Sequence, residues 1–562
     1  MKFANWDISG FDREAAVELC RGGINPLAAV FLSSRGILGA DEAARFLADD
    51  LADIYDPFLL ADRQKAVDRV NLALERGETI AIFGDYDVDG MTASALLKSF
   101  FRTRNRECEI YIPGREEEGY GLNCPAIDCL KSRGVNLIIT VDCGITAVSE
   151  TAYARGLGVD VIVTDHHECK DILPDAAAVV DPKRRDCPYP NKTLAGVGVA
   201  FKLVCAMEKE RDLGELISEY GDLVGIGTIA DVMPVTGENR VLIRTGLRAL
   251  AHKPRPGLQK LMREIGVPRK EIDTAAIGFL LAPRLNAAGR MGRTSLSVDV
   301  LLTDDPAEAE RLTAELSRLN AQRRELESVI FDEVAERLAG TDPKGPIVMS
   351  GQNWYQGVLG IVAARTAEKN RFPAIIISVD ADGVGRGSCR SFGSFKLYTA
   401  LLRCDDLLIN YGGHEMAAGL TIAAEKLDEF RARITGVYHE MVKIPPTPTL
   451  HVDFEVEKPD LLVLQNVEAL GTLEPFGNSF IPPCLCICGA RLVSVQSVGG
   501  GKHTRMRIQK KNRTMDCIFF AMEAEKMGVV EGDRVDVAFQ PQVNDFRRRT
   551  VQLHIMDIRP AI

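Results

Sequence analysis

The stretch Phe83-Gly84-Asp85-Tyr86-Asp87-Val88-Asp89-Gly90 directly follows the apolar run Thr79-Ile80-Ala81-Ile82. An apolar run of this length indicates a strand that is buried on both faces of a parallel sheet. Apolar segments at 137–141 and 159–164 repeat the pattern, and the segment 147–155 between them has the composition of a helix. Strands that alternate with helices predict a doubly wound α/β domain.

Acidic residues stand at the ends of three of these predicted strands. After the first come Asp85, Asp87 and Asp89, after the second comes Asp142, and after the third come Asp165, His166 and His167. Ligands of an open α/β sheet bind beyond the carboxyl ends of its strands, so the three clusters should meet in one crevice. Asp231, in the segment 225–232, is a fourth candidate.

Several carboxylates in one crevice would repel one another and raise one another's pKa, and a divalent cation removes this conflict. Aspartate and histidine ligands without a thiolate favour Mg²⁺ or Mn²⁺, and this many ligands suit two ions. Two such ions can activate a water, neutralise a phosphate and stabilise the leaving oxygen.

Each acidic motif also has a structural interpretation. An isolated DxDxDG could be a calcium loop, but a strand precedes it and Leu96, not glutamate, stands at loop position 12. Aspartate at a strand end is often a turn former or helix cap, and a histidine pair often lies on the surface. Four such clusters together would cost stability without a cation, so we expect a metal site.

The length of 562 residues exceeds that of a domain with a single hydrophobic core, so several domains are expected. A helical segment is expected at 1–60 and the first α/β domain at 61–240. A helical region at 241–340 ends in a long connecting helix that starts after Asp304 or Asp305 and would measure roughly 50 Å. A second, smaller α/β domain is expected at 341–444. After the linker Pro445-Pro446-Thr447-Pro448, alternating segments at 449–562 predict a small β-barrel.

The charge of the chain is uneven. Its net charge of −11 alone argues against a nucleic-acid ligand. Three stretches nevertheless contain basic residues and no acid: 274–298, 383–404 and 502–513. Such runs are often solvated surface, but three of them in an acidic chain favour a phosphate-bearing partner.

The fourteen cysteines are scattered, which favours reduced thiols over a disulfide framework. Cys484, Cys486 and Cys488 alternate as on one face of a strand, whereas a zinc site usually has a CxxC-type spacing. The sequence contains no run of 18 apolar residues and no apolar core near its start, so we expect a cytoplasmic protein with no membrane segment.

In their order along the chain, the motifs DYDVDG at 85–90, VDCG at 141–144 and DHH at 165–167 resemble the DHH phosphoesterase superfamily. Within it, the closer similarity is to the RecJ family of single-strand-specific 5′→3′ DNA exonucleases. The segments at 385–391 and 412–419 look like the DHHA1 substrate-binding domain, and the C-terminal barrel resembles an OB-fold. Further supporting segments lie at 56–60, 111–115, 119–123, 194–202 and 283–292.

The resemblance implies roles for individual residues. Two Mn²⁺ or Mg²⁺ ions would be held by Asp85, Asp87, Asp142, His166 and Asp231. His167 would take part in catalysis, with Asp89 and Asp165 supporting the ligands. DNA would be bound by Arg115, Arg284, Asn286, Arg290, Arg386, Ser388, Arg390, His414, Lys502, Arg505 and Arg507. The chain departs from the family at Trp354-Tyr355, where Trp-His is usual, so no imidazole acts there.

Some of these roles also follow from chemistry. The glycines at 383–391 would let backbone amides approach a phosphate that Arg390 grips with two hydrogen bonds, although glycines also simply build turns. The run 502–511 fits a positive groove along a strand of the barrel. Aromatic residues for base stacking are few there, and we assign Phe519 and Phe520 to the core.

The resemblance therefore implies an exonuclease that hydrolyses single-stranded DNA 5′→3′ to nucleoside monophosphates in DNA repair and recombination. Single-strand-binding protein and a helicase would be possible partners. One alternative is a DHH phosphoesterase for short oligoribonucleotides or cyclic dinucleotides, but the C-terminal barrel and basic runs favour a long strand. Another is a catalytically silent DNA-binding scaffold, against which the intact acids argue.

Overall fold

The computed structural model describes residues 3–48, 50–114, 119, 121–268, 271–443, 447–545 and 548–561. The chain divides into two compact units. Unit 1 consists of Met1–Ile54, Pro234–Arg244 and Thr447–Ile562, and unit 2 consists of Tyr55–Met233 and Thr245–Pro446. The five domains expected from the sequence stay a prediction, because one compact unit can contain several domains.

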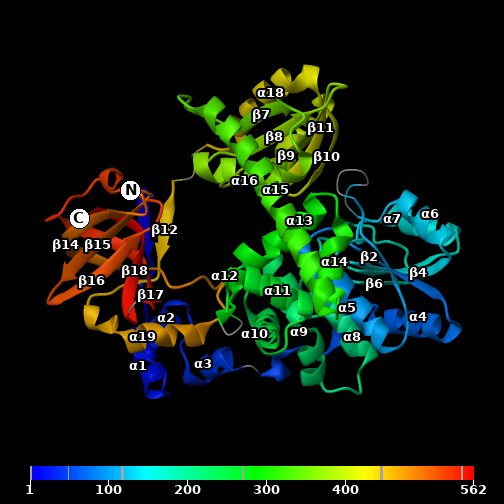
Figure 1. Ribbon diagram of the computed structural model, residues 1–562, viewed down its shortest axis with the longest axis horizontal. Helices are drawn as coiled ribbons and strands as arrows, with labels where there is room; N and C mark the ends of the chain where they lie inside the picture. The colour runs from blue at the N-terminus through cyan, green and yellow to red at the C-terminus, as the bar shows by residue number, and fades with distance from the viewer. Residues whose placement is uncertain are drawn as a thin grey trace. The chain divides into compact units, whose positions relative to one another are not determined.

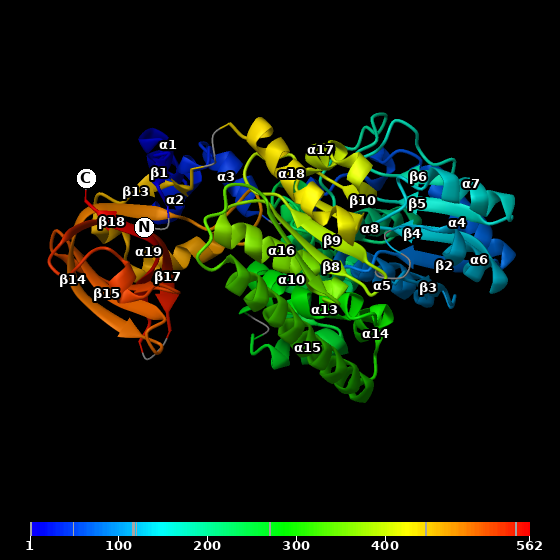
Figure 2. The ribbon, with the colours of Figure 1, turned by 90° about the horizontal axis from the view of Figure 1, so that it is seen from above.

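Unit 2 contains a five-stranded, fully parallel sheet with the order β3-β2-β4-β5-β6. The chain runs from β2 to β3 on one side and then to β4 on the other, so the loops after β2 and β4 diverge and leave a crevice between them. Figure 2 shows the strands in this order. The strands are β2 (Thr79–Gly84), β3 (Glu109–Tyr111), β4 (Val135–Val141), β5 (Asp160–Thr164) and β6 (Ala178–Val180).

Helices cover both faces of this sheet, which confirms the doubly wound α/β prediction (Figure 1). One face packs against α6 (Cys124–Ser132) and α7 (Val148–Gly156) through buried residues such as Phe83, Ile138 and Ile127. The other face is covered by α4 (Arg63–Arg76), α5 (Val88–Thr103) and α8 (Gly196–Met207). Because apolar residues on both strand faces are buried, the strands carry no polar alternation.

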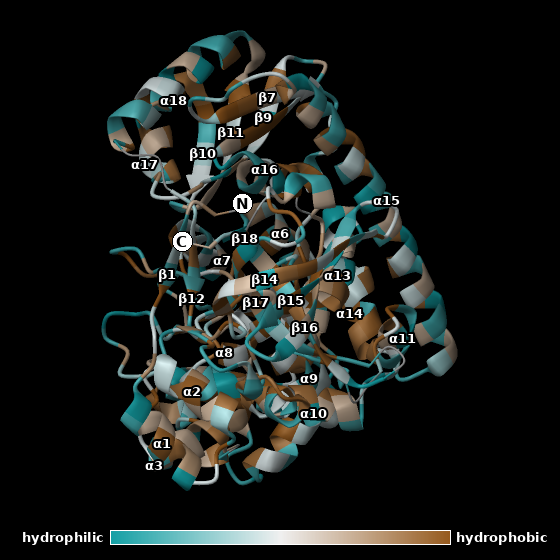
Figure 3. Ribbon diagram, turned by 90° about the vertical axis from the view of Figure 1, so that its left-hand side faces the viewer, coloured by the Kyte–Doolittle hydropathy of each residue, from teal (hydrophilic) through white to brown (hydrophobic). Residues whose placement is uncertain are grey.

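A helical region follows the sheet, as predicted. It contains α9 (Leu213–Ala230), α10 (Gly237–His252), α11 (Pro256–Glu264), α12 (Thr274–Ala276), a π-helical turn at Ile277–Leu281, α13 (Ala282–Arg290) and α14 (Thr294–Leu302). The long helix α15 (Pro306–Leu338) has 33 residues. It begins where the sequence indicates, since the Asp305 side chain accepts a hydrogen bond from Ala307 N at 2.9 Å. Hydrophilic and hydrophobic residues alternate along it (Figure 3).

The second sheet of unit 2 has the order β10-β11-β9-β8-β7, and only β7 and β8 are parallel. Its strands are β7 (Ile347–Gln352), β8 (Ala374–Val379), β9 (Val384–Arg390), β10 (Leu408–Gly413) and β11 (Ala417–Ala423). Helix α16 (Gln356–Asn370) packs on one face, and α17 (Leu397–Leu402) and α18 (Leu427–Met441) on the other. The expected smaller α/β domain is therefore confirmed as a mixed sheet.

The glycine-rich segment at 383–391 differs from the expectation. It forms β9, which pairs with β8 on one side and with β11 on the other. The ladder hydrogen bonds therefore occupy its amide groups, and a phosphate could be reached only by its side chains. The prediction of free backbone amides was wrong because a glycine-rich segment can be a closely packed strand as well as a loop.

Unit 1 contains a closed five-stranded barrel with neighbours β14-β15-β16-β18-β17, closed by β14 pairing with β17. Strands β16 and β18 are parallel, and this topology is that of the OB-fold, as predicted. The strands are β14 (Leu485–Val498), β15 (His503–Lys510), β16 (Arg513–Phe519), β17 (Arg534–Asn544) and β18 (Thr550–Pro560). Cys484, Cys486 and Cys488 share one face at the start of β14, and all fourteen cysteines are free thiols.

The N-terminal segment packs with this barrel. Three of the expected helices are present, α1 (Arg13–Arg21), α2 (Pro26–Ser34) and α3 (Ala40–Leu47). The sequence did not reveal β1 (Asn5–Ile8), which pairs in parallel with β12 (Thr449–Val452). Its residues Asn-Trp-Asp-Ile alternate between polar and apolar, but a pattern of four residues is too short to be distinctive, so only its distant partner defines the strand.

Arg240 fastens a third chain segment into unit 1. Its guanidinium donates hydrogen bonds to the carbonyl oxygens of Leu473 and Pro475, both at 2.8 Å. It also lies 3.9 Å from the ring centroid of Phe46 and 5.1 Å from that of Phe480. A buried guanidinium needs such partners, so Arg240 is a structural residue of unit 1.

Among the residues that the model describes, no helix has the length and hydropathy needed to cross a membrane.

Candidate active site

The four predicted clusters of acids lie together in unit 2. Asp85 follows β2, Asp142 follows β4 with φ +59°, and His166 follows β5. Asp231 ends α9. Three groups of side chains bring their ligand atoms within 4.8 Å of one another. The groups are Asp85 with Asp87 and Asp142, Asp89 with His166 and Asp231, and Asp142 with His166 and His167. Asp142 and His166 each belong to two groups, so the groups form one continuous cluster.

Local hydrogen bonds orient the acids of the DYDVDG motif. The Asp87 carboxylate caps α5 and accepts from the backbone N–H groups of Asp89 and Gly90, at 2.9 and 3.1 Å. The buried Asp89 carboxylate accepts from Gly196 N at 2.6 Å and Val197 N at 2.8 Å, at the N-terminus of α8. The motif is thus a strand–turn–helix, and the alternative of a calcium loop is wrong.

His166 is buried and electrically neutral. Burial, together with the nearby His167, lowers its pKa to about 3. Its Nε2 lies 3.0 Å from Asp142 Oδ1 and 3.5 Å from Asp231 Oδ2, yet none of these contacts has hydrogen-bond geometry. A neutral imidazole keeps the lone pair that a metal ion requires.

Burial and mutual repulsion disfavour the charged form of three carboxylates in the cluster. Burial and then the charges of neighbouring aspartates raise the pKa of Asp89 and Asp142 well above the ordinary value. Burial, and then Asp87, raise the pKa of Asp231 to about 7. Asp231 Oδ2 is buried without a hydrogen bond among the described residues. Oxygen and imidazole donors that need a positive charge fit a divalent cation such as Mn²⁺ or Mg²⁺.

Asp165 organises the loop after β5. Its Oδ1 lies 2.7 Å from both His166 N and His167 Nδ1, and its Oδ2 accepts from Ile145 N at 2.9 Å. Burial opposes the charge of His167, but the hydrogen bond to Asp165 and the charge of Asp165 raise the pKa of His167 to about 9. Asp165 therefore favours the protonated form of His167, which suits a phosphate neighbour.

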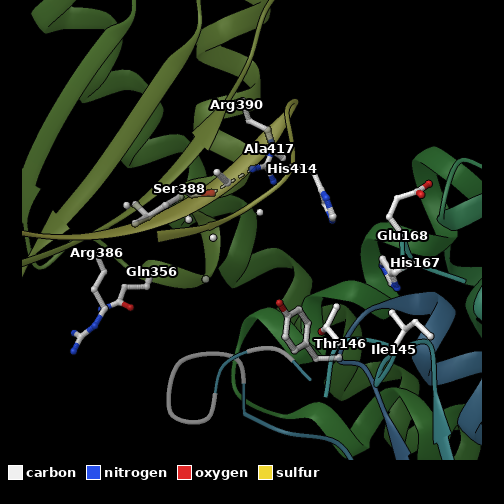
Figure 4. A pocket seen from close by; sticks show the side chains of 18 of the residues that line it. Ile145, Thr146, His167, Glu168, Gln356, Arg386, Ser388, Arg390, His414 and Ala417 are labelled. Atoms are coloured by element: carbon white, nitrogen blue, oxygen red, sulfur yellow. Dashed lines mark hydrogen bonds between the residues drawn. The ribbon is translucent and has the colours of Figure 1, made fainter. Parts of the chain in front are cut away.

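A cavity of about 630 Å³ extends from this loop to the second sheet of unit 2. Asp165, His167 and Glu168 lie on one wall, and β9 with the segment after β10 forms the other. Figure 4 shows the two walls facing each other, with His414 between them. The predicted phosphate-binding residues that line this cavity are Arg386, Ser388, Arg390 and His414. Arg386 also forms an ion pair with Asp380 at 3.3 Å.

Other predicted DNA-binding residues lie elsewhere. Asn286 accepts a hydrogen bond from Val88 N at 3.1 Å, Arg284 donates to Leu280 O at 2.7 Å, and Arg290 donates to Gly357 O at 3.3 Å. These three do not line the cavity but support elements around it. Arg115 lies outside the described residues.

The predicted basic residues of the barrel, Lys502, Arg505 and Arg507, are exposed. Arg507 is partly neutralised by Asp516, which lies 2.9 Å away. Phe519 is buried as predicted, but the assignment of Phe520 to the core is wrong, because half of its side chain is exposed. Its ring centroid lies 5.5 Å from that of His503 and 5.2 Å from that of His554.

The cavity also contains residues that the sequence interpretation did not single out, namely Tyr86, Thr146, Glu168, Lys170 and Gln356. Most of them lie within a few positions of a predicted site residue. Proximity along the chain was the one available signal, since side chains around a motif share its loop.

Comparison with known protein families agrees with this geometry. The model described as "DHH family, N-terminal domain" matches residues 79–228, the DHHA1 domain matches 344–440, and the RecJ OB domain matches 452–557. The fold and the buried Asp/His cluster thus define a DHH-type phosphoesterase with a DHHA1 domain and an OB domain.

Relatives narrow the assignment. The chain is 38% identical over 559 residues to the single-stranded-DNA-specific exonuclease RecJ of Bacillus subtilis, a match that spans 98% of this chain and 70% of that protein. It is 34% identical to the Escherichia coli protein of the same name, over 95% of this chain and 96% of the relative. The chain belongs to the RecJ family.

Crystal structures of the family contain metal. RecJ from Thermus thermophilus in complex with Mn²⁺ superposes with a TM-score of 0.84 at 29% identity, covering 99% of this chain and 80% of that one. The Mg²⁺ complex of the same protein gives a TM-score of 0.78 at 28% identity, covering 99% of this chain and 79% of that one.

Proposed function

We propose that the chain is a single-stranded-DNA-specific exonuclease that removes nucleoside monophosphates from the 5′ end. The observation that supports this is one cavity with two different walls: the loop after β5, with Asp165 and His167 beside the Asp/His cluster, and the Arg386–Arg390 side. A terminal 5′-phosphate would bind at the basic wall. The first phosphodiester would then lie beside the Asp/His cluster, where it is cleaved.

We propose that Asp85, Asp87, Asp142, His166 and Asp231 hold two Mn²⁺ or Mg²⁺ ions. When bound, the ions supply an activated water and charge neutralisation for phosphodiester hydrolysis. The chain's own contribution is orientation. Asp87 is fixed by capping α5, Asp89 fixes α8 beside the cluster, and Asp165 holds His167 in one orientation. His167 lies on the cavity wall, where its protonated form would stabilise negative charge on the substrate phosphate.

The basic wall would select the end of the strand. Arg390 and Arg386 carry fixed positive charge, and Ser388 and His414 add hydrogen-bond donors. Exposed Lys502, Arg505 and Arg507 of the barrel would bind phosphates of single-stranded DNA. Single-strand-binding protein and a helicase remain the partners that the family resemblance suggests.

End-labelled strands test the direction of digestion. A single strand labelled at the 5′ end should release its label at once in Mn²⁺ or Mg²⁺, a 3′-labelled strand should release it last, and a chelator should stop both. The variant Asp87→Asn should lose nuclease activity and keep its fold and DNA affinity. Early release of the 3′ label would contradict the proposed polarity.

Two 5′ ends test the role of the basic wall. Replacing Arg390 by Gln removes a charged hydrogen-bond donor, which corresponds to a rise in KM of roughly 10- to 100-fold. The rise should be confined to strands that carry a 5′-phosphate, and 5′-hydroxyl strands should change little. An equal effect on both substrates would show that the wall does not recognise the terminal phosphate.

A further inference from the structure

Helix α13 is attached directly to the DYDVDG loop. Asn286 Oδ1 accepts a hydrogen bond from Val88 N, the residue after Asp87, at 3.1 Å. A β-carbon added at Gly289 would lie 2.4 Å from the carbonyl oxygen of Tyr86, so the helix touches the loop backbone. Any displacement of α13 therefore acts on the loop that carries Asp85 and Asp87.

The C-terminus of α13 is also attached to the start of α16. The Tyr355 hydroxyl donates a hydrogen bond to the carbonyl oxygen of Arg290, the last residue of α13, at 3.0 Å. Arg290 Nη1 in turn donates to Gly357 O at 3.3 Å. A β-carbon at Gly357 would lie 2.2 Å from Arg290 O, so the two helix ends are in backbone contact.

Helix α16 then packs against the basic wall of the cavity. A β-carbon at Gly360 would lie 3.1 Å from both Arg390 Nη2 and Ser388 Oγ. Gln356 and Gly357, at the start of the helix, line the same cavity. Contacts therefore run without interruption from the Asp/His cluster through α13 and α16 to the residues expected to hold the terminal phosphate.

The residue before Tyr355, Trp354, contacts the long helix α15 instead of α13. Trp354 Nε1 donates to Glu333 Oε2 on α15 at 2.9 Å, and the ring lies 5.6 Å from the Arg337 guanidinium. Trp354 thus fixes the turn to the long helix. The Tyr355 hydroxyl links this turn to α13, beside the bond from Arg290 to Gly357.

We propose that Tyr355 is a positioning residue that sets the distance between the Asp/His cluster and the basic wall, and thereby the length of the released product. This inference rests on the proposed function, in which the wall holds the 5′-phosphate. With the distance fixed, one phosphodiester of the strand lies at the cluster. With the distance loosened, neighbouring phosphodiesters compete for that position, and misplacement of the reacting atoms by about 1 Å lowers the rate by roughly 100-fold.

Two substitutions test this inference. Tyr355→Phe removes only the hydroxyl, and Gly357→Ala places a methyl group against Arg290 O and pushes α13 and α16 apart. Tyr153→Phe is the matched control. It removes a tyrosine hydroxyl from the outer helix α7 that donates a hydrogen bond to Asp128 of α6 at 2.7 Å. The substrate is a 5′-phosphorylated, internally labelled single strand in Mn²⁺.

The wild type and Tyr153→Phe should release a single product length. Tyr355→Phe should release mixed lengths, with kcat lowered about 10-fold and the affinity for the strand unchanged, and Gly357→Ala should broaden the distribution further. Circular dichroism tests whether each variant is folded. If Gly357→Ala is unfolded, the product lengths of Tyr355→Phe alone decide the test. A single, wild-type product length from folded Tyr355→Phe would overturn the inference, whatever the rate.

The two proposals fail in different ways. If Arg390→Gln raises KM for 5′-phosphorylated strands and Tyr355→Phe keeps one product length, the wall recognises the phosphate and only the role of Tyr355 is refuted. If Arg390→Gln has no selective effect, the proposed function fails first and the role of Tyr355 fails with it.

Discussion

Removing the metal should make the stability of unit 2 fall as the pH rises. Without a cation, burial raises the pKa of Asp231 to about 7, from an ordinary value of 3.8. Between these two pH values the folded protein holds a proton at Asp231 that the unfolded chain has released, so stability decreases through this window. The difference corresponds to about 4 kcal/mol by pH 8. Asp89, Asp142 and His167 act in the same direction, whereas the lowered pKa of His166 opposes the change below pH 6.5.

Fluorescence can follow this change in unit 2 alone. The chain has two tryptophans, of which Trp6 lies in unit 1 and Trp354 in unit 2, so Trp6→Phe leaves a unit 2 signal. In chelator, the midpoint of thermal unfolding should drop by several degrees between pH 5.5 and pH 8. With Mn²⁺ it should not, because the cation replaces the protons.

Asp231→Asn provides the control for the source of the effect. The amide cannot ionise, so the chelator-treated variant should be more stable than the wild type at pH 8 and similar to it at pH 5. Equal stability of the chelator-treated wild type at pH 5.5 and pH 8 would refute the reasoning. It would mean that the cluster is compensated without a metal ion.

Two further predictions concern unit 1. Arg240→Met should lower the free energy of unfolding of unit 1 by roughly 2–4 kcal/mol, because several carbonyl groups lose their hydrogen-bond donor. Replacing the exposed Arg21 by Met should leave this free energy unchanged. Urea unfolding, followed by the fluorescence of Trp6 in a Trp354→Phe background, measures both. Phe520→Ala should weaken the binding of single-stranded DNA by roughly 1–3 kcal/mol without changing its salt dependence. Arg505→Gln should instead reduce the slope of log K against log salt by about 0.7. If Phe520→Ala binds the strand as tightly as the wild type, no base stacks on Phe520.

The sequence predicts best where local pattern and fold rule coincide. Asp85, Asp142 and His166 follow apolar strands of one parallel sheet, and the rule for carboxyl ends brings them together before any coordinates are seen. The cap at Asp305 located the long helix for a similar reason, because its signal lies within one turn.

Features that depend on distant partners could not be predicted. Strand β1 exists because it pairs with residues more than 440 positions away, and the alternation in its own four residues is too short to indicate a strand. The glycines of β9 suggest a loop until the strands on both sides are known. Phe520 directly follows the core residue Phe519, and only the barrel register turns one ring inward and leaves the other half exposed. The bond from Tyr355 to Arg290 is likewise visible only in three dimensions.

The pairing of β1 with β12 also affects co-translational folding. Residues 5–8 are translated more than 440 residues ahead of their partner at 449–452 and of the barrel that follows. At bacterial rates of roughly 5–20 residues per second, the early segment waits on the order of a minute. During this time the faces of α1 and α2 that pack against the barrel lack that partner, so nascent chains should recruit a chaperone at this segment and release it once the barrel has been translated.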